Sequence, residues 1–144
     1  LGYLTLTALT ASSAVLVTVH PQMLDIMSMS QFLLMLGGIM RSIREAGAQV
    51  NLKWFRYLVT RYEPTDGPQQ QMVGFMQALF PGQMLSAHML KSTAISDAGI
   101  TKQTLYEVER THFVRSTYDR AMTSLNEVND EVAALVHRAW ERPE

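Results

Sequence analysis

The sequence predicts an α/β protein in which a mostly parallel sheet is flanked by helices and the chain ends in a long amphipathic helix. Two short apolar runs, VLVTV at residues 15–19 and FRYLV at residues 55–59, have the length and the branched and aromatic content of buried strands. Helical hydrophobic patterns lie between and after these runs. Strands separated by helices usually pair in parallel, so this order predicts helices on both faces of the sheet.

The first nineteen residues carry no charged side chain and are long enough to raise the alternative of a membrane span. They lack a basic flank, however, and threonine and serine residues dilute the apolar stretch. We therefore expect a buried helix at residues 4–14 and a strand at 15–19 that is buried on both faces. His20 and Pro21 end this strand, because the residue before a proline is disfavoured in the α region.

The middle of the chain predicts a helix, a strand and a second helix. The first helix starts at Ser30 and is closed by Gly47, a typical residue just after a helix end. The strand at 55–59 runs into turn-forming residues, and a helix follows from Pro68 to Phe80, with proline in a tolerated first-turn position. The apolar stripe of the first of these helices consists of Phe32, Leu33, Leu36, Ile39, Met40 and Ile43.

The last third predicts a short strand, a turn with a weaker helix, and a long helix. A third strand is expected near residues 88–93, followed by a turn at residues 97–99 and a weaker helix that reaches Glu109. In the final segment, residues 118–140, apolar side chains recur at steps of three and four. Thr117 precedes this pattern and is expected to cap the helix.

Composition excludes several classes of function. A net charge of -1 argues against a broad basic surface, so any contact with nucleic acid must be local. The absence of cysteine excludes disulfides, thiolate metal sites and cysteine nucleophiles, and suits a reducing cytoplasm. The four histidines lack the spacing of a helical metal site, and the motifs of serine hydrolases, zinc proteases and phosphate-binding loops are absent. No catalytic residue and no metal ligand is therefore assigned.

Polar side chains follow two of the predicted strands at the point where each strand ends. Residues 60–63 (TRYE) follow the strand at 55–59, and residues 91–93 (KST) end the third predicted strand. Ligands of open α/β sheets bind beyond the carboxyl ends of the strands, and these two ends are neighbours if the strands pair in parallel. A cation, hydroxyls and an aromatic ring there form a shallow site for a planar polar ligand such as a nucleobase. A solvated strand end is the alternative.

Five arginines gather in the C-terminal third, at positions 110, 115, 120, 138 and 142. Arg138 and Arg142 share a helical face near the end of the last helix, where cations suit the helix dipole. Glutamate and aspartate residues interleave with them, so charge alone favours a solvated surface with ion pairs. The alternative is a weak, salt-sensitive contact with DNA phosphates through Arg115, Arg120, Arg138 and Arg142.

Three segments carry a resemblance to a known family: LVTVHPQMLDIMSMSQFLLML, LVTRYEPTDGPQQQMVGFM and MLKSTAISDAGITKQTLYEV. In their order and spacing they resemble the C-terminal part of the ParA-type plasmid partition ATPases, deviant-Walker P-loop NTPases of the MinD-like group. The resemblance is closest to the RepA proteins of repABC plasmids. It covers nearly the whole chain, so residues 1–144 are expected to form the C-terminal part of a single ParA-type ATPase domain.

The resemblance implies a plasmid segregation ATPase that binds ATP and Mg²⁺, dimerises around the nucleotide, and binds non-specific DNA. It also implies a ParB-type centromere-binding partner and a cytoplasmic, nucleoid-associated location without membrane contact. The glycine-rich phosphate loop of the family, with its lysines and the switch aspartates, is expected upstream of Leu1. Phosphoryl transfer depends on those groups, so the chain alone is not expected to hydrolyse ATP or to bind a cofactor tightly.

The resemblance also assigns five residues to the nucleotide. Thr60, Arg61 and Tyr62 match the family's Thr-x-Tyr-acid stretch near the adenine, at the end of a late strand. Lys91 and Ser92 fall in the second segment that faces the base. These are the residues that the strand ends had already singled out.

A non-catalytic interaction module, which keeps the fold without a nucleotide site, is the second hypothesis. In this hypothesis the long C-terminal helix and exposed apolar surface serve pairing with another chain. A sheet that ends at residues 15–19 would expose an edge and apolar faces, so we expect the isolated chain to self-associate. A small membrane protein anchored by residues 1–19 is the third, outlying hypothesis.

Overall fold

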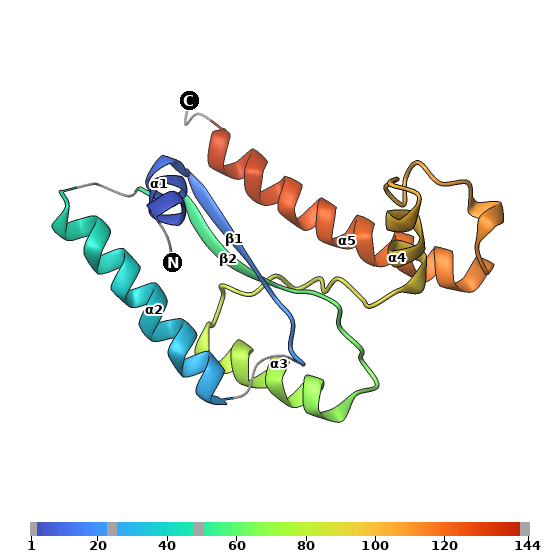
Figure 1. Cartoon of the computed structure of the whole chain (residues 1–144), viewed down its shortest axis with the longest axis horizontal. Helices are drawn as coiled ribbons and strands as arrows, with labels where there is room; N and C mark the ends of the chain where they lie inside the picture. Colours follow the sequence, from blue (N-terminus) through green and yellow to red (C-terminus); the bar gives the residue numbers. More distant parts are fainter. Residues whose placement is uncertain (1–2, 23–25, 48–50, 142–144) are drawn as a thin grey trace.

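The computed structural model describes residues 3–22, 26–47 and 51–141 (Figure 1). Within these ranges the chain is α/β and ends in a long helix, as the sequence predicts. The elements in order are α1 (Tyr3–Ala11), β1 (Ala14–Val19), α2 (Ile26–Glu45), β2 (Trp54–Val59), α3 (Gly67–Leu79), α4 (Thr93–Ile100), the 3₁₀ turn η1 (Arg110–His112) and α5 (Arg115–Trp140).

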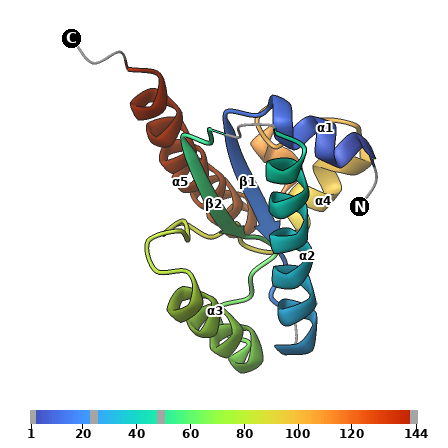
Figure 2. The same cartoon turned by 90° about the vertical axis from the view of Figure 1, so that its left-hand side faces the viewer.

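Strands β1 and β2 form a two-stranded parallel sheet, in register from the pair Ala14 and Trp54 to the pair Val19 and Val59. Helix α5 lies on one face of this sheet and α2 on the other (Figure 1 and Figure 2). Helix α3 lies below the sheet in both views. The predicted strands at 15–19 and 55–59 and the placement of helices on both faces are confirmed.

The core divides into two layers because successive side chains of a strand point to opposite faces. On the face of α2 and α3, the buried side chains are Val19, Tyr57, Met76 and Phe80. On the face of α5, they are Leu58, Leu85, Val128 and Leu135. The sheet therefore packs against α2 and α3 on one face and against α5 on the other, through separate clusters.

Burial at the N-terminus differs from the prediction. Strand β1 is not buried on both faces: Val19 is buried, Thr18 is exposed and the remaining residues are half-buried. Since β1 lies at the edge of a two-stranded sheet, its side chains have strand neighbours on one side only. Helix α1 contains no buried residue, and Tyr3 and Leu4 are each 81% exposed, so the predicted buried helix is an exposed one. Among the described residues, no helix is long and apolar enough to cross a membrane.

Helix α2 ends and α3 begins where their sequences predict, but α2 begins at Ile26, before the predicted start at Ser30. Gly47 has a φ of +76°, the left-handed conformation that favours glycine just after a helix. At the start of α3, the carboxylate of Asp66 accepts a hydrogen bond from the backbone N–H of Gln69 at 3.1 Å, and Pro68 occupies the first turn. Of the predicted stripe on α2, Ile39 and Ile43 are buried, while the side chain of Phe32 is outside the described set.

The third strand, predicted near residues 88–93, is not formed. The N–H of Leu85 donates to Tyr57 O and the N–H of Met89 donates to Val59 O, both at 2.9 Å. Between these two hydrogen bonds the chain runs from Leu85 to Met89, four residues, while β2 runs only from Tyr57 to Val59, two residues. Isolated bridges therefore replace a continuous ladder of hydrogen bonds. The prediction fails because the segment carries extra residues that β2 cannot pair.

Helix α5 supplies the hydrogen bonds that a continuous strand would have made. The carboxylate of Glu131 accepts from the backbone N–H groups of Ser86 and Ala87, both at 2.8 Å. The hydroxyl of buried Ser124 donates to His88 O and accepts from the N–H of Leu90, each at 2.9 Å. Two polar side chains of α5 therefore fix the irregular segment beside β2.

Three further predictions in the last third are wrong. Residues 97–99, predicted as a turn, lie inside α4, which begins after Ser92 because the Ser92 hydroxyl accepts a hydrogen bond from the N–H of Ala94 at 3.2 Å. Residues 101–109 form turns in place of the weaker helix. Thr117 does not cap α5, since the helix begins at Arg115 and its N-cap residue, Val114, provides no side-chain hydrogen bond.

Candidate functional site

The end of β2 lies beside the segment that carries Lys91. The N–H of Tyr62 donates to Met89 O at 3.1 Å, and the N–H of Lys91 donates to Tyr62 O at 3.0 Å. These bonds align residues 60–62 with residues 89–91, although the second segment is not a strand. The two polar strand ends predicted from the sequence are therefore neighbours.

Four of the five residues predicted to lie near a base surround one cavity at this position. Its volume is about 280 Å³. Whole drug-sized ligands usually occupy roughly 300–1,000 Å³, so this cavity suits a smaller group such as a planar base. The lining consists of the predicted Thr60, Arg61, Lys91 and Ser92 together with Met89, Leu90, Thr93, Ile95 and Ser96.

Thr60 and Ser92 are held in place by the elements that they end or begin. The N–H of Thr60 donates to Val19 O at 2.8 Å, and its hydroxyl reaches the same oxygen at 3.3 Å, so the end of β1 fixes this residue. Ser92 caps α4. Both hydroxyls are positioned by regular structure, which keeps the rim of the cavity rigid.

Tyr62, the fifth predicted residue, is not part of the cavity lining. Its ring packs edge-on against the ring of His88, with the centroids 5.0 Å apart. Burial lowers the pKa of His88 below its usual value, while the charge of Glu131 acts in the opposite direction. His88 is therefore neutral near pH 7, and Tyr62 packs against an uncharged ring.

Arg61 adopts a strained backbone conformation at the rim of the cavity. Its φ is +52°, in the left-handed region that a residue with a Cβ seldom adopts. This conformation ends β2 and costs an L-residue about 1–2 kcal/mol. Strain of this kind persists where the surrounding structure enforces it, and it is concentrated at binding sites.

Because of this strain, we expect the variant Arg61→Gly to be more stable than Arg61→Ala by about 1 kcal/mol. Both variants lack the guanidinium group, so the comparison isolates the backbone from the side chain. Urea denaturation of the two proteins measures the difference. Equal stabilities would show that the left-handed conformation at this position carries no strain.

Lys91 forms an ion pair with Glu63, a residue to which sequence reasoning had assigned no role. The Nζ atom of Lys91 lies 3.1 Å from the carboxylate of Glu63. Buried Gln69 supports Glu63, because its Oε1 atom accepts from the Glu63 N–H at 3.0 Å. Glu63 belongs to the polar run after β2, but its partner is far along the chain, so only the folded structure reveals the pair.

The arginines predicted to contact DNA do not form one compact patch. Arg115 lies 3.8 Å from Asp119 in the first turns of α5, whereas Arg138 is in the last turn and donates to Ala134 O at 3.3 Å. Arg120 and Arg138 face the same side of the helix but are separated by about 27 Å along its axis. Arg142 lies outside the described residues.

The cavity lining combines hydroxyls and cations with apolar side chains. Hydroxyls and cations from two chain segments face the apolar side chains of Met89, Leu90 and Ile95. Across residues 3–22, 26–47 and 51–141, no group of three histidine, aspartate or glutamate side chains could hold a metal.

Two curated proteins are similar to the chain over almost its full length. One is the "Putative replication protein A" of Sinorhizobium fredii, 70% identical over 142 residues, which are 99% of this chain and 35% of that protein. A protein of the same name from Rhizobium rhizogenes is 59% identical over 143 residues, with the same coverage. No family model matches the chain. The chain thus spans about a third of the length of the curated relatives it matches.

Proposed function

We propose that this chain is the base-binding part of a plasmid replication and partition protein of the RepA and ParA type. The relatives named as replication proteins support a role with a plasmid replicon. The observation that carries the nucleotide assignment is the cavity that Thr60, Arg61, Lys91 and Ser92 share beyond the end of a parallel strand. The resemblance of the sequence to partition ATPases had singled out these residues independently of their positions in space.

In this proposal the residues of the chain bind and orient the base but do not perform hydrolysis. The hydroxyls of Thr60 and Ser92 and the cation of Lys91 contact polar edges of the base, while Leu90 and Ile95 contact its face. In the complete protein, ATP would supply the transferable phosphoryl group and Mg²⁺ would neutralise its charge. Phosphoryl transfer depends on positioning the reacting groups and on neutralising their charge. The cavity contributes to the positioning, because it orients the base.

The proposal extends to the partners that the resemblance implies. They are a second copy of the protein, a ParB-type centromere-binding protein, and non-specific DNA of the nucleoid. The exposed cations of α5, Arg115, Arg120 and Arg138, are the described residues that could reach DNA phosphates. Glu127 lies between Arg120 and Arg138 on the same side of the helix, so any such contact is weak.

A titration with a fluorescent ATP analogue and Mg²⁺ tests the nucleotide assignment. We would compare this chain with a chimera in which it replaces the matching 142 residues of the Sinorhizobium fredii relative. The chimera is expected to bind the ATP analogue at least about a hundredfold more tightly than the chain alone does, because charge-assisted contacts with the phosphates are restored. Within the chimera, Lys91→Met should weaken binding about tenfold, which corresponds to one polar contact.

Lys102→Met is the matched control, because Lys102 is exposed and is absent from the cavity lining. This variant should bind within about twofold of the chimera, since a distant exposed charge is screened by salt. Loss of binding to the same extent in both lysine variants would contradict the assigned cavity. If the chimera does not bind the analogue at all, the nucleotide assignment is wrong.

A specific observation favours the interaction module as the second candidate function. The N-terminal helices expose large apolar side chains: Tyr3 and Leu4 of α1 at 81% each, and Met27 and Leu34 of α2 at 72% and 77%. Exposed apolar side chains on neighbouring elements are typical of a surface that contacts another protein. A dimer that forms equally well with and without nucleotide would support this function over the first.

A further inference from the structure

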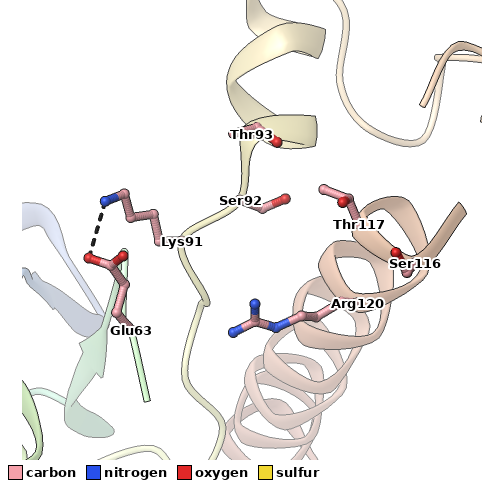
Figure 3. Close-up of a pocket in the computed structure, with 7 residues that line it drawn as sticks. All are labelled: Glu63, Lys91, Ser92, Thr93, Ser116, Thr117 and Arg120. Carbon is pink, nitrogen blue, oxygen red and sulfur yellow. Dashed lines mark hydrogen bonds and ion pairs between the residues drawn. The ribbon is translucent and has the colours of Figure 1, made fainter. Parts of the chain in front are cut away.

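A second cavity lies on the other side of the segment that carries Lys91, between this segment and the first turns of α5 (Figure 3). Its volume is about 380 Å³. Every lining residue has a polar side chain, unlike the mixed lining of the base cavity. The lining consists of Glu63, Lys91, Ser92, Thr93, Ser116, Thr117 and Arg120.

The charges around this cavity leave one cation without a counter-ion. The single lining carboxylate, Glu63, is paired with Lys91 at 3.1 Å. Asp119, next to Arg120 in the sequence, is occupied by Arg110 at 2.7 Å and by Arg115 at 3.8 Å. Among the residues that the structure describes, no carboxylate lies within ion-pair distance of Arg120. In Figure 3 the guanidinium of Arg120 extends from α5 toward the segment of Lys91 and Ser92.

The hydroxyls of the cavity are also available as donors. Ser116 and Thr117 lie in the first turn of α5, one turn before Arg120, so the three side chains share one side of the helix. For the described part of the chain, no protein hydrogen bond is formed by the hydroxyls of Thr93, Ser116 or Thr117. The first turn of α5 contains no acidic residue and has no side-chain cap, so nothing nearby competes for these donors.

We propose that this cavity binds a phosphate group. An unpaired guanidinium binds two phosphate oxygens at once, and the hydroxyls of Ser116 and Thr117 reach the remaining oxygens from the same helix. Lys91 also lines the cavity, but its ammonium group extends away from Arg120 and is paired with Glu63, so Arg120 is the cation that would hold the anion (Figure 3). A tetrahedral group with several oxygens matches donors that converge from two elements better than a planar carboxylate does. The site goes beyond the proposed base site: the two cavities share Lys91, Ser92 and Thr93, but Ser116, Thr117 and Arg120 line only this one, and Thr60 and Arg61 do not line it.

Inorganic phosphate, titrated into the ¹⁵N-labelled chain at constant ionic strength, tests this site. We expect saturating shifts of the amide signals of Ser92, Thr93, Ser116, Thr117 and Arg120. The variant Arg120→Gln should raise the dissociation constant about tenfold, because it removes a charge-assisted contact. The matched control Arg44→Gln removes an exposed arginine of α2 that lines neither cavity, and it should change the constant less than about twofold.

Two further experiments distinguish the possible sources of the phosphate group and distinguish the phosphate site from the base site. A short duplex DNA shifts the same amides if the cavity accepts backbone phosphodiesters, whereas free phosphate alone shifts them if it accepts only small phosphate ligands. Adenosine has no phosphate, so its binding reports on the base cavity alone. The dissociation constant for adenosine should be unaffected by Arg120→Gln. Phosphate shifts that never saturate, or that weaken equally in Arg120→Gln and Arg44→Gln, would overturn the phosphate site and leave the base site standing.

Discussion

Replacing Glu131 with alanine is expected to lower the free energy of unfolding by about 2–4 kcal/mol, measured by urea denaturation. Its carboxylate accepts two backbone hydrogen bonds, from Ser86 and Ala87, at 2.8 Å each. Hydrogen bonds to charged groups are worth about 1.5–3 kcal/mol each, and the alanine variant leaves both donors unpaired. The loss should release the segment beside β2 that positions Lys91.

Two controls define what this result means. Glu131→Gln retains one acceptor oxygen, so its cost should be intermediate. Glu127→Ala removes an exposed carboxylate one turn earlier on α5, and its cost should stay within about 0.5 kcal/mol. If Glu131→Ala costs no more than Glu127→Ala, water satisfies these two N–H groups as well as the carboxylate does.

The variant Leu85→Ala should lower the free energy of unfolding by about 2–5 kcal/mol, because it opens a cavity in the core. Leu85 is 1% exposed and packs with Leu58, Val128 and Leu135 between β2 and α5. The backbone N–H of Leu85 donates a hydrogen bond to Tyr57 O at 2.9 Å. This bond prevents the segment from moving into the space left by the missing atoms. Differential scanning calorimetry or chemical denaturation measures the loss.

Leu79→Ala is the matched control for this prediction. Leu79 is 42% exposed at the end of α3, so the same truncation there should cost less than about 1 kcal/mol. A similar cost at both positions would mean that the α5 face of the sheet is loosely packed. That result would also weaken the account of how α5 holds the segment beside β2.

The elements that sequence predicts best are those whose signals are local. The strands at 15–19 and 55–59 are short apolar runs, and the start of α3 follows from Asp66 and Pro68. Parallel pairing of these strands then follows from the helix between them. The sequence also predicts that residues 60–62 and 89–91 are neighbours, although isolated bridges stand in place of the third strand on which this prediction depends.

The predictions that fail depend on contacts between distant segments. The third strand is missing because Glu131 and Ser124, on α5, take over the hydrogen bonds of residues 86–90. The exposure of α1 likewise cannot be read from its apolar sequence, since burial requires a covering element. The second cavity follows the same rule, because it exists only where α5 begins beside the segment of Lys91.

The parallel pairing of β1 with β2 also has a consequence for the order of folding. Each residue of β1 pairs with one that lies about forty positions later, and α2 occupies most of the intervening chain. The entropy of closing so long a loop must be overcome before any strand contact forms. The helices can form locally on a much faster timescale, so the sheet should assemble late. Until it does, the apolar residues of both strands are open to other chains, and the yield of refolding should fall as protein concentration rises.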